Sequence, residues 1–135
     1  MTRYGVKKQI WMSDLKKQLR PEISSIVLTE NFSLEEKFQN EVLRPIIKLQ
    51  HDIILCCFEH YLQQNKGSIE ALTPVQTEEY IANIFKTSAR LKTELRGLII
   101  GQFTLEEYKN YIGIPSQLNR RMNNMILQRI VSCYV

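Results

Sequence analysis

One group of residues in this sequence has the types and spacing of a nucleophilic site. Cys56 and Cys57 precede His60 by four and three positions in a segment expected to be helical, where such spacings place side chains next to each other. A thiolate paired with a protonated imidazole would be a nucleophile. However, no Asn or Asp is placed to orient the imidazole, and Cys57 belongs to the apolar face. We therefore expect a core thiol with His60 at the core edge, and assign no catalytic residue; Cys57 and His60 are the candidates only if the protein is a thiol enzyme.

Two pairs of adjacent carboxylates have the residue types of a catalytic acid/base dyad. Glu35-Glu36 and Glu106-Glu107 each follow a Ser or Thr that can begin a helix. Negative charge in the first turn of a helix is stabilised by the helix dipole, and a Glu three positions after the capping residue completes a capping box. Capping accounts for both pairs without catalysis.

The patterns that bind metals, phosphates or cofactors are missing. His51 and His60 are nine positions apart, on opposite sides of one helix, and neither belongs to the Glu-x-x-His pattern of di-iron bundles. The sequence has no C-x-x-C pair and no glycine-rich phosphate loop. We therefore expect neither a metal ion nor a cofactor.

Three polar residues interrupt apolar helix faces. Gln50, Gln102 and Arg129 each fall among apolar positions on a helical wheel. Because a guanidinium is rarely buried without a partner, we expect Arg129 to be at least half buried and to meet a carboxylate, a helix C-terminal carbonyl or a bound anion. One interpretation is a buried network with Gln50 and Gln102 that fixes helix register. The other is a pocket in which Arg129 holds an anionic ligand and the glutamines orient it.

Residues 105–122 resemble the helix-turn-helix of bacterial transcription regulators. A short helix, a Gly-Ile turn at Gly113, a Ser cap and a second helix carrying Asn119, Arg120 and Arg121 follow in that order. Two positions depart from the pattern, since Lys109 stands where Ala is usual and Leu118 comes one position early. Asn119, Arg120 and Arg121 are the candidate nucleic-acid contacts if the resemblance reflects DNA binding.

The elements that would position these residues are all predicted to be helices. Thr73-Pro74 begins a helix to about residue 87, and further helices are expected at 88–102, at 105–113 and, capped by Ser116, at 117–133. Residues 45–65 are apolar over most of the circumference and end before Gly67, which suits a left-handed terminator. We predict an all-α, single-domain bundle of five or six helices around this central helix. Residues 1–30 form an N-terminal arm with a short helix and an extended segment at 22–31, and residues 31–135 form the bundle.

Small residues recur every four positions on one face of the helix expected at 88–102. Ala89, Thr93, Gly97 and Gly101 form this strip. We expect a neighbouring helix to approach closely along it.

Composition and charge narrow the class of protein. The 135 residues are 44% hydrophobic and 24% charged, as in ordinary globular domains and unlike disordered, collagen-like or membrane proteins. No apolar stretch approaches the ~20 residues that span a bilayer, and no secretory signal follows the basic start. With three cysteines, which fit a reducing compartment, we expect a cytoplasmic protein. The charged residues give the sequence two basic ends and a mildly acidic middle. The basic ends either bind nucleic acid or pack on the acidic middle.

As a whole, the sequence is similar to a family of short bacterial all-α proteins of unassigned role. The similarity rests on residues 43–48 (LRPIIK), 99–104 (IIGQFT) and 118–122 (LNRRM). Some relatives carry a glyoxalase label, but that fold needs repeated βαβββ units and a His/Glu metal site, which this sequence lacks. The resemblance implies a fold and no catalytic residue.

The leading functional expectation is a non-enzymatic interaction protein that forms a homo-oligomer. Leu127 and Val131 lie outside the apolar stripe of the last helix, and spare apolar surface often marks an interface. DNA binding through residues 105–122 is the alternative, followed by a small-ligand pocket or a thiol enzyme. We expect no membrane partner.

Overall fold

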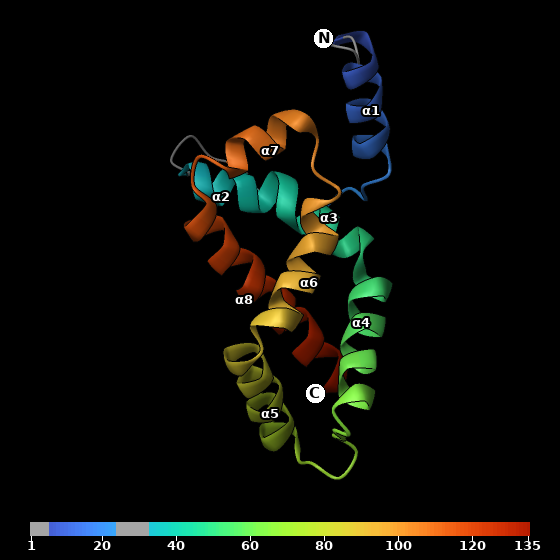
Figure 1. The fold of residues 1–135 in the computed structure, drawn as a ribbon, viewed down its shortest axis with the longest axis vertical. Helices are drawn as coiled ribbons and strands as arrows, with labels where there is room; N and C mark the ends of the chain where they lie inside the picture. The colour runs from blue at the N-terminus through green and yellow to red at the C-terminus, as the bar shows by residue number, and fades with distance from the viewer. Residues whose placement is uncertain (1–5, 24–32) are drawn as a thin grey trace. The chain divides into compact units, whose positions relative to one another are not determined.

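The computed structural model describes residues 6–23 and 33–135, and every regular element in these ranges is a helix (Figure 1). The prediction of an all-α fold is confirmed. The predicted extended segment at 22–31 lies almost entirely outside the described residues. In chain order the elements are α1 (Val6–Gln18), α2 (Leu34–Phe38), the π-helical η1 (Gln39–Leu43), α3 (Arg44–Leu49), α4 (His51–Gln64), α5 (Pro74–Thr87), α6 (Ala89–Ile100), α7 (Leu105–Tyr111) and α8 (Pro115–Tyr134).

The chain divides into two compact units. Unit 1 contains residues 1–49 and 99–118, and unit 2 contains residues 50–98 and 119–135. The prediction of a single domain over residues 1–135 stays a prediction. In the parts of the chain that the structure describes, no helix is long and apolar enough to cross a membrane.

A wide helical turn precedes Pro45 in unit 1. Pro45 lies within a continuous helical run, since α2, η1 and α3 follow one another without a gap from Leu34 to Leu49. The backbone N–H of Arg44 donates to the carbonyl of Gln39, five residues back, as in a π-helix. Proline has no N–H and its ring clashes with the carbonyl four residues earlier in an α-helix. The π turn accommodates the proline because it changes the spacing of the preceding carbonyls.

The predicted central helix at 45–65 is two helices. Gln50 separates α3 from α4, with a backbone conformation (φ −92°, ψ 11°) outside the helical region. Only one side of α4 is buried, at Ile54, Phe58 and Leu62, while Ile53 is half exposed. The prediction of one helix apolar over most of its circumference was therefore wrong, because a helix with several apolar faces needs neighbours on each of them.

Aromatic rings organise the core of unit 1. Phe103, between α6 and α7, packs edge-on against Phe38 of α2, with ring centroids 5.4 Å apart, and against Tyr111 of α7 at 5.7 Å. Both phenylalanines are buried. Among the described residues of this unit, the other buried apolar side chains are Val42, Leu43, Ile46, Ile47, Ile99 and Leu118.

Stripes with a period of about four residues form the core of unit 2. In the part of α8 that belongs to unit 2, the fully buried residues are Met122, Ile126 and Ile130, one helical turn apart. Each of the other helices contributes a similar stripe: Ile54, Phe58 and Leu62 from α4, Ile81, Ile84 and Phe85 from α5, and Leu91 and Leu95 from α6.

The helix starts follow the capping residues, with one exception. Thr73 and Gln76 form a complete capping box with Pro74 in the first turn of α5, and Thr104 and Glu107 form another on α7. Ser33 accepts the backbone N–H of Glu36 on α2, as expected. Ser116 was predicted to cap a helix that starts at residue 117, but α8 begins two residues earlier, at Pro115, a residue well suited to the first helical position.

Two glycines differ from their predicted roles. At the end of α4, Lys66 takes the left-handed conformation, with φ 54°, and Gly67 does not. A Cβ at Gly67 would lie 2.5 Å from the hydroxyl of Tyr80 and 3.2 Å from a methyl group of Leu62, so these side chains would have to shift. On α6, a Cβ at Gly97 would meet nothing within 4 Å, so the predicted close approach along the small-residue strip is wrong at this position.

Candidate functional site: a buried ion pair and two exposed apolar stripes

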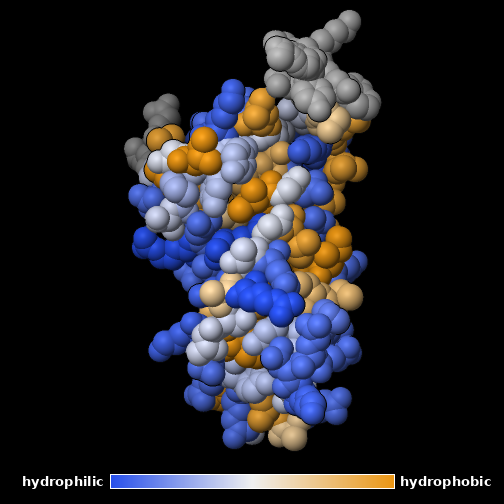
Figure 2. Space-filling model, in the orientation of Figure 1, coloured by the Kyte–Doolittle hydropathy of each residue, from blue (hydrophilic) through white to orange (hydrophobic). Residues whose placement is uncertain are grey.

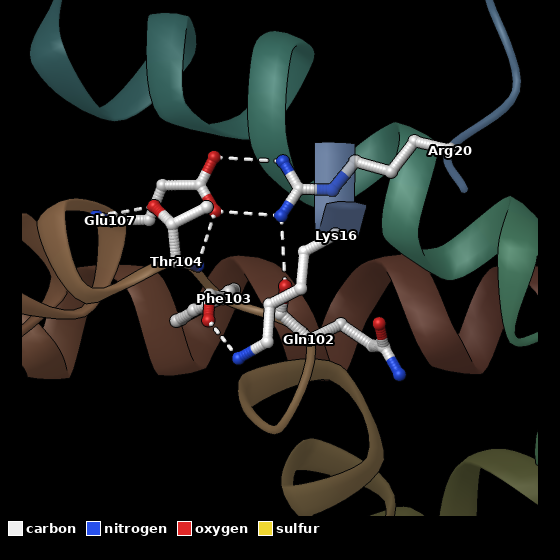
Figure 3. Close-up of polar contacts among 6 residues, drawn as sticks. All are labelled: Lys16, Arg20, Gln102, Phe103, Thr104 and Glu107. Carbon is white, nitrogen blue, oxygen red and sulfur yellow. Dashed lines mark hydrogen bonds and ion pairs between the residues drawn. The ribbon is translucent and has the colours of Figure 1, made fainter. Parts of the chain in front are cut away.

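A buried ion pair joins the end of α1 to α7 in unit 1 (Figure 3). Both terminal nitrogens of Arg20 donate to the carboxylate of Glu107, at 2.8 and 2.7 Å, and one of them also donates to the carbonyl of Gln102 at 2.8 Å. The side chains are only 7% and 10% exposed. A bidentate pair of this kind is specific in its geometry as well as favourable in charge. It therefore holds the Arg20 guanidinium in a fixed position against Glu107 of α7.

Glu107 has two structural roles at once. Its carboxylate accepts the backbone N–H of Thr104 at 2.8 Å, and its own N–H donates to the Thr104 hydroxyl at 3.1 Å. Burial alone would raise the pKa of the Glu107 carboxyl, but the hydrogen bonds from Arg20 and Thr104 and the charges of Arg20 and Lys17 outweigh it, so this pKa lies below its ordinary value. Glu107 is therefore ionised in the folded protein at neutral pH.

A second polar contact holds α1 one turn earlier. Lys16 donates to the carbonyl of Phe103 at 2.9 Å (Figure 3). Lys16 lies in the last turn of α1, and Arg20 follows two residues after the helix ends at Gln18. The end of α1 thus faces the loop that begins α7.

Apolar side chains on another side of α1 are exposed. Met12, Leu15 and Leu19 are 46%, 39% and 63% exposed. Their spacing of three and then four residues places them in one stripe along the helix. We call these three residues the α1 stripe.

The same spacing recurs on α7. Leu105, Tyr108 and Ile112 are 43%, 44% and 55% exposed, and again three and four residues separate them. We call these residues the α7 stripe. Unit 1 thus has two apolar helix stripes in contact with solvent.

The residues predicted to form a polar cluster each have a different hydrogen-bond partner. Arg129 is partly buried, and its guanidinium lies 3.1 Å from Nδ1 of His51, a partner that the sequence did not suggest. Gln50 donates to the carbonyl of Leu98 at 3.0 Å, also in unit 2. Gln102 belongs to unit 1, where its backbone carbonyl accepts from Arg20.

The thiol candidates do not form an activated pair. Cys57 lies 4.0 Å from the carboxylate of Glu94, and both Cys56 and His60 are exposed. Burial, followed by the charges of Glu94 and Cys56, raises the pKa of the Cys57 thiol. A thiol with a raised pKa is a poorer source of thiolate.

The helix-turn-helix segment has the predicted order of elements. α7 ends at Tyr111 and α8 begins at Pro115. Arg120 is exposed, whereas Asn119 and Arg121 are partly buried and each has an interaction partner. Of the three candidate contacts, Arg120 is the most accessible.

The apolar residues that suggested an interface at the last helix are largely covered. Leu127 and Val131 are partly buried on α8. The two stripes of exposed apolar side chains lie instead along α1 and α7.

No group of three or more His, Cys, Asp or Glu side chains within residues 6–23 and 33–135 is placed to hold a metal ion. In comparisons with known proteins, no protein-family model, no curated protein and no solved structure matches the chain significantly. The fold defines an all-α protein, and the resemblance to short bacterial proteins stays a prediction.

Proposed function

We propose that this protein is a non-enzymatic interaction protein that self-associates through the α1 stripe and the α7 stripe. The observation that carries the proposal is the exposure of three apolar side chains at matching spacing on each of two helices of unit 1. A row of apolar side chains along one face of a helix is normally directed towards a packing partner. Figure 2 shows apolar side chains at the surface among hydrophilic ones on the face in view.

The proposed partner is a second copy of the chain. In a two-fold symmetric dimer, a surface on one copy that contacts a different surface on the other is matched by the reciprocal contact. The α1 stripe of each copy would pack on the α7 stripe of the other. Both stripes have the three-and-four spacing that lets helices interdigitate, so the two contacts together would bury all six exposed side chains of each copy.

Analytical ultracentrifugation over a range of concentrations tests this proposal. Burying a half-exposed leucine is worth about 1 kcal/mol, so Leu15→Ser with Leu19→Ser should weaken dimerisation at least about thirtyfold. Tyr108→Ser with Ile112→Ser should do the same. The control is Val75→Ser on α5 of unit 2, where a 67% exposed side chain is removed. A monomer at about 100 µM, or equal effects of all three variants, would refute the proposal.

Cross-linking distinguishes the reciprocal arrangement from pairing of like stripes. One chain carries Leu15→Cys and another Tyr108→Cys, both with Cys56, Cys57 and Cys133 replaced by Ser. Reciprocal packing predicts disulfides in the mixture and few in either chain alone. Pairing of α1 with α1 predicts disulfides in the sample that contains only the Leu15→Cys chain, and few between the two different chains.

DNA binding is a second candidate, favoured by the exposed Arg120 near the start of α8. Phosphate contacts release counterions, so binding should weaken steeply with salt. An electrophoretic shift with genomic fragments at two salt concentrations tests this, with Arg120→Ala compared with Lys86→Ala on α5. Equal binding by the two variants would exclude Arg120 as a contact.

A further inference from the structure

Unit 1 contains a pocket of about 580 Å³, and none of the residues of the two stripes lines it. Its walls come from α1, from α2 and η1, from α7 and from the turn that follows α7. Its lining includes Lys17, Lys37, Phe38, Val42, Glu106, Asn110 and Ile114. The volume is within the range of about 300–1,000 Å³ that is usual for small-molecule sites.

Part of the pocket wall is apolar. Phe38 and Val42 are each 8% exposed, and Ile114 is partly buried. Phe38 is held in place by its edge-on contact with Phe103. A ligand bound here would bury an aliphatic or aromatic group against these apolar side chains.

Charges of both signs line the pocket. Lys17 and Lys37 supply two ammonium groups, and the exposed carboxylates of Glu41 and Glu106 supply two negative charges. Lys37 and Glu41 are four residues apart, a spacing that favours an ion pair, yet among the described side chains neither they nor Glu106 belong to one. The carboxylate of Glu107 is already neutralised by Arg20.

The helix beside the pocket has an irregular backbone. Glu41 and Val42 belong to the π turn η1. Single π turns within α-helices occur often at functional sites, since they present side chains in directions that an α-helix does not. This observation is independent of the pocket's volume and charge.

We propose that this pocket binds a small zwitterion with an apolar body. Balanced charges around an apolar wall favour a ligand that carries both an ammonium and a carboxylate, whereas a simple anion or cation would meet a like charge. A large apolar amino acid and a short apolar peptide with free ends share this chemistry. The pocket does not overlap the residues of the two stripes, so the inference does not depend on self-association.

Titration of the ¹⁵N-labelled full chain with defined probes tests the ligand class. The zwitterions are L-phenylalanine and trileucine, and comparing them separates an amino acid from a peptide. The matched probes for L-phenylalanine are 3-phenylpropionate, phenethylamine and N-acetyl-L-phenylalanine amide, which lack one charge or both, and the matched probe for trileucine is N-acetyl-trileucine amide, which lacks both. We expect saturable shifts of the amides of Lys37, Val42 and Asn110 with at least one zwitterion, and at least about tenfold weaker binding of its matched probes. Equal binding of the uncharged amide, or no shift by either zwitterion at about 10 mM, would overturn the proposal.

Charge-removing variants locate the site. Lys37→Gln and Glu106→Gln should each weaken zwitterion binding about two- to fivefold, the size of an exposed ion pair. Lys86→Gln and Glu79→Gln, at exposed positions of α5 in unit 2, should leave it unchanged. Unaltered circular dichroism shows that each variant folds. Equal affinities in the pocket and control variants would place the binding elsewhere and refute the assignment.

Discussion

Arg20 and Glu107 are 87 positions apart in sequence, yet their charged groups meet at 2.7 and 2.8 Å in the interior of unit 1. The same carboxylate caps α7 through Thr104. The Glu107 side chain thus both caps the first turn of α7 and binds Arg20, just after the end of α1.

Removing one partner of this ion pair should destabilise unit 1. Arg20→Met leaves the buried carboxylate of Glu107 without its cation, which costs about 3 kcal/mol in comparable buried pairs. Urea-induced unfolding measures the change. Arg90→Met, in an exposed pair with Glu94 on α6, is the control and should cost less than about 1 kcal/mol. Equal losses in the two variants would mean that the Arg20 pair adds nothing beyond a surface contact.

The stability of the protein should depend on pH through Glu107. Its pKa is lower in the folded chain than the ordinary value of 4.5, so the unfolded chain takes up a proton first as the pH falls. The contribution is complete above the unfolded pKa and is lost as the pH falls through the folded one. The free energy of unfolding should therefore decrease below about pH 4.5, and Glu107→Gln should flatten this part of the curve. An unchanged curve in the variant would assign the acid sensitivity to other carboxylates.

Gly97→Ala should stabilise the protein. Glycine within a helix costs about 1 kcal/mol relative to alanine, and the new methyl group would meet no atom within 4 Å. Thermal unfolding measures the gain. Gly67→Ala is the opposing case, since its methyl group would collide with the Tyr80 hydroxyl, and it should lower the melting temperature. A melting temperature lowered by Gly97→Ala would show that the strip on α6 is covered.

Lys66→Gly should also stabilise the protein. Lys66 has a positive φ of 54° at the end of α4, a conformation that costs an L-residue about 1 kcal/mol and glycine almost nothing. Chemical denaturation should show a gain of about 0.5–1 kcal/mol. Lys66→Ala keeps the Cβ and removes the charge, so it should give no such gain; an equal gain would attribute the effect to charge.

The three thiols should differ in their reactivity. The raised pKa of Cys57 leaves less thiolate at neutral pH, and alkylation proceeds through the thiolate. We expect iodoacetamide to modify the exposed Cys56 and Cys133 before Cys57, as followed by mass spectrometry of peptides from Cys56→Ser and Cys57→Ser chains. Faster modification of Cys57 would revive the thiol-enzyme hypothesis.

The sequence predicts those parts of the structure that short segments determine. Thr73-Pro74 and Thr104 with Glu107 satisfy backbone N–H groups within four residues, and both helices begin where expected. The pairing of Glu107 with Arg20 depends on the approach of segments far apart in sequence, and a helical wheel contains no such information. The same holds for Arg129, whose burial could be inferred from its apolar neighbours but whose partner, His51, lies 78 positions away.

The candidate sites were predictable to a smaller degree. A stripe such as Leu105, Tyr108 and Ile112 is visible in the sequence, but its exposure depends on whether another helix covers it. The pocket beside η1 requires the π turn, which arises from the conflict between Pro45 and the carbonyls before it. A helical wheel assumes a constant 100° per residue, so it places the side chains before and after such a turn out of phase.

The π turn also bears on how this helix can change in evolution. A π turn contains one residue more than the α turn that it replaces, so the run from Leu34 to Leu49 can lose one residue at Gln39–Leu43 with its flanking faces still aligned. A deletion within α4 or α8 would instead rotate every later side chain by about 100° and turn a core stripe towards solvent. We expect any homologue that is one residue shorter between positions 39 and 43 to have lost the proline that corresponds to Pro45 as well.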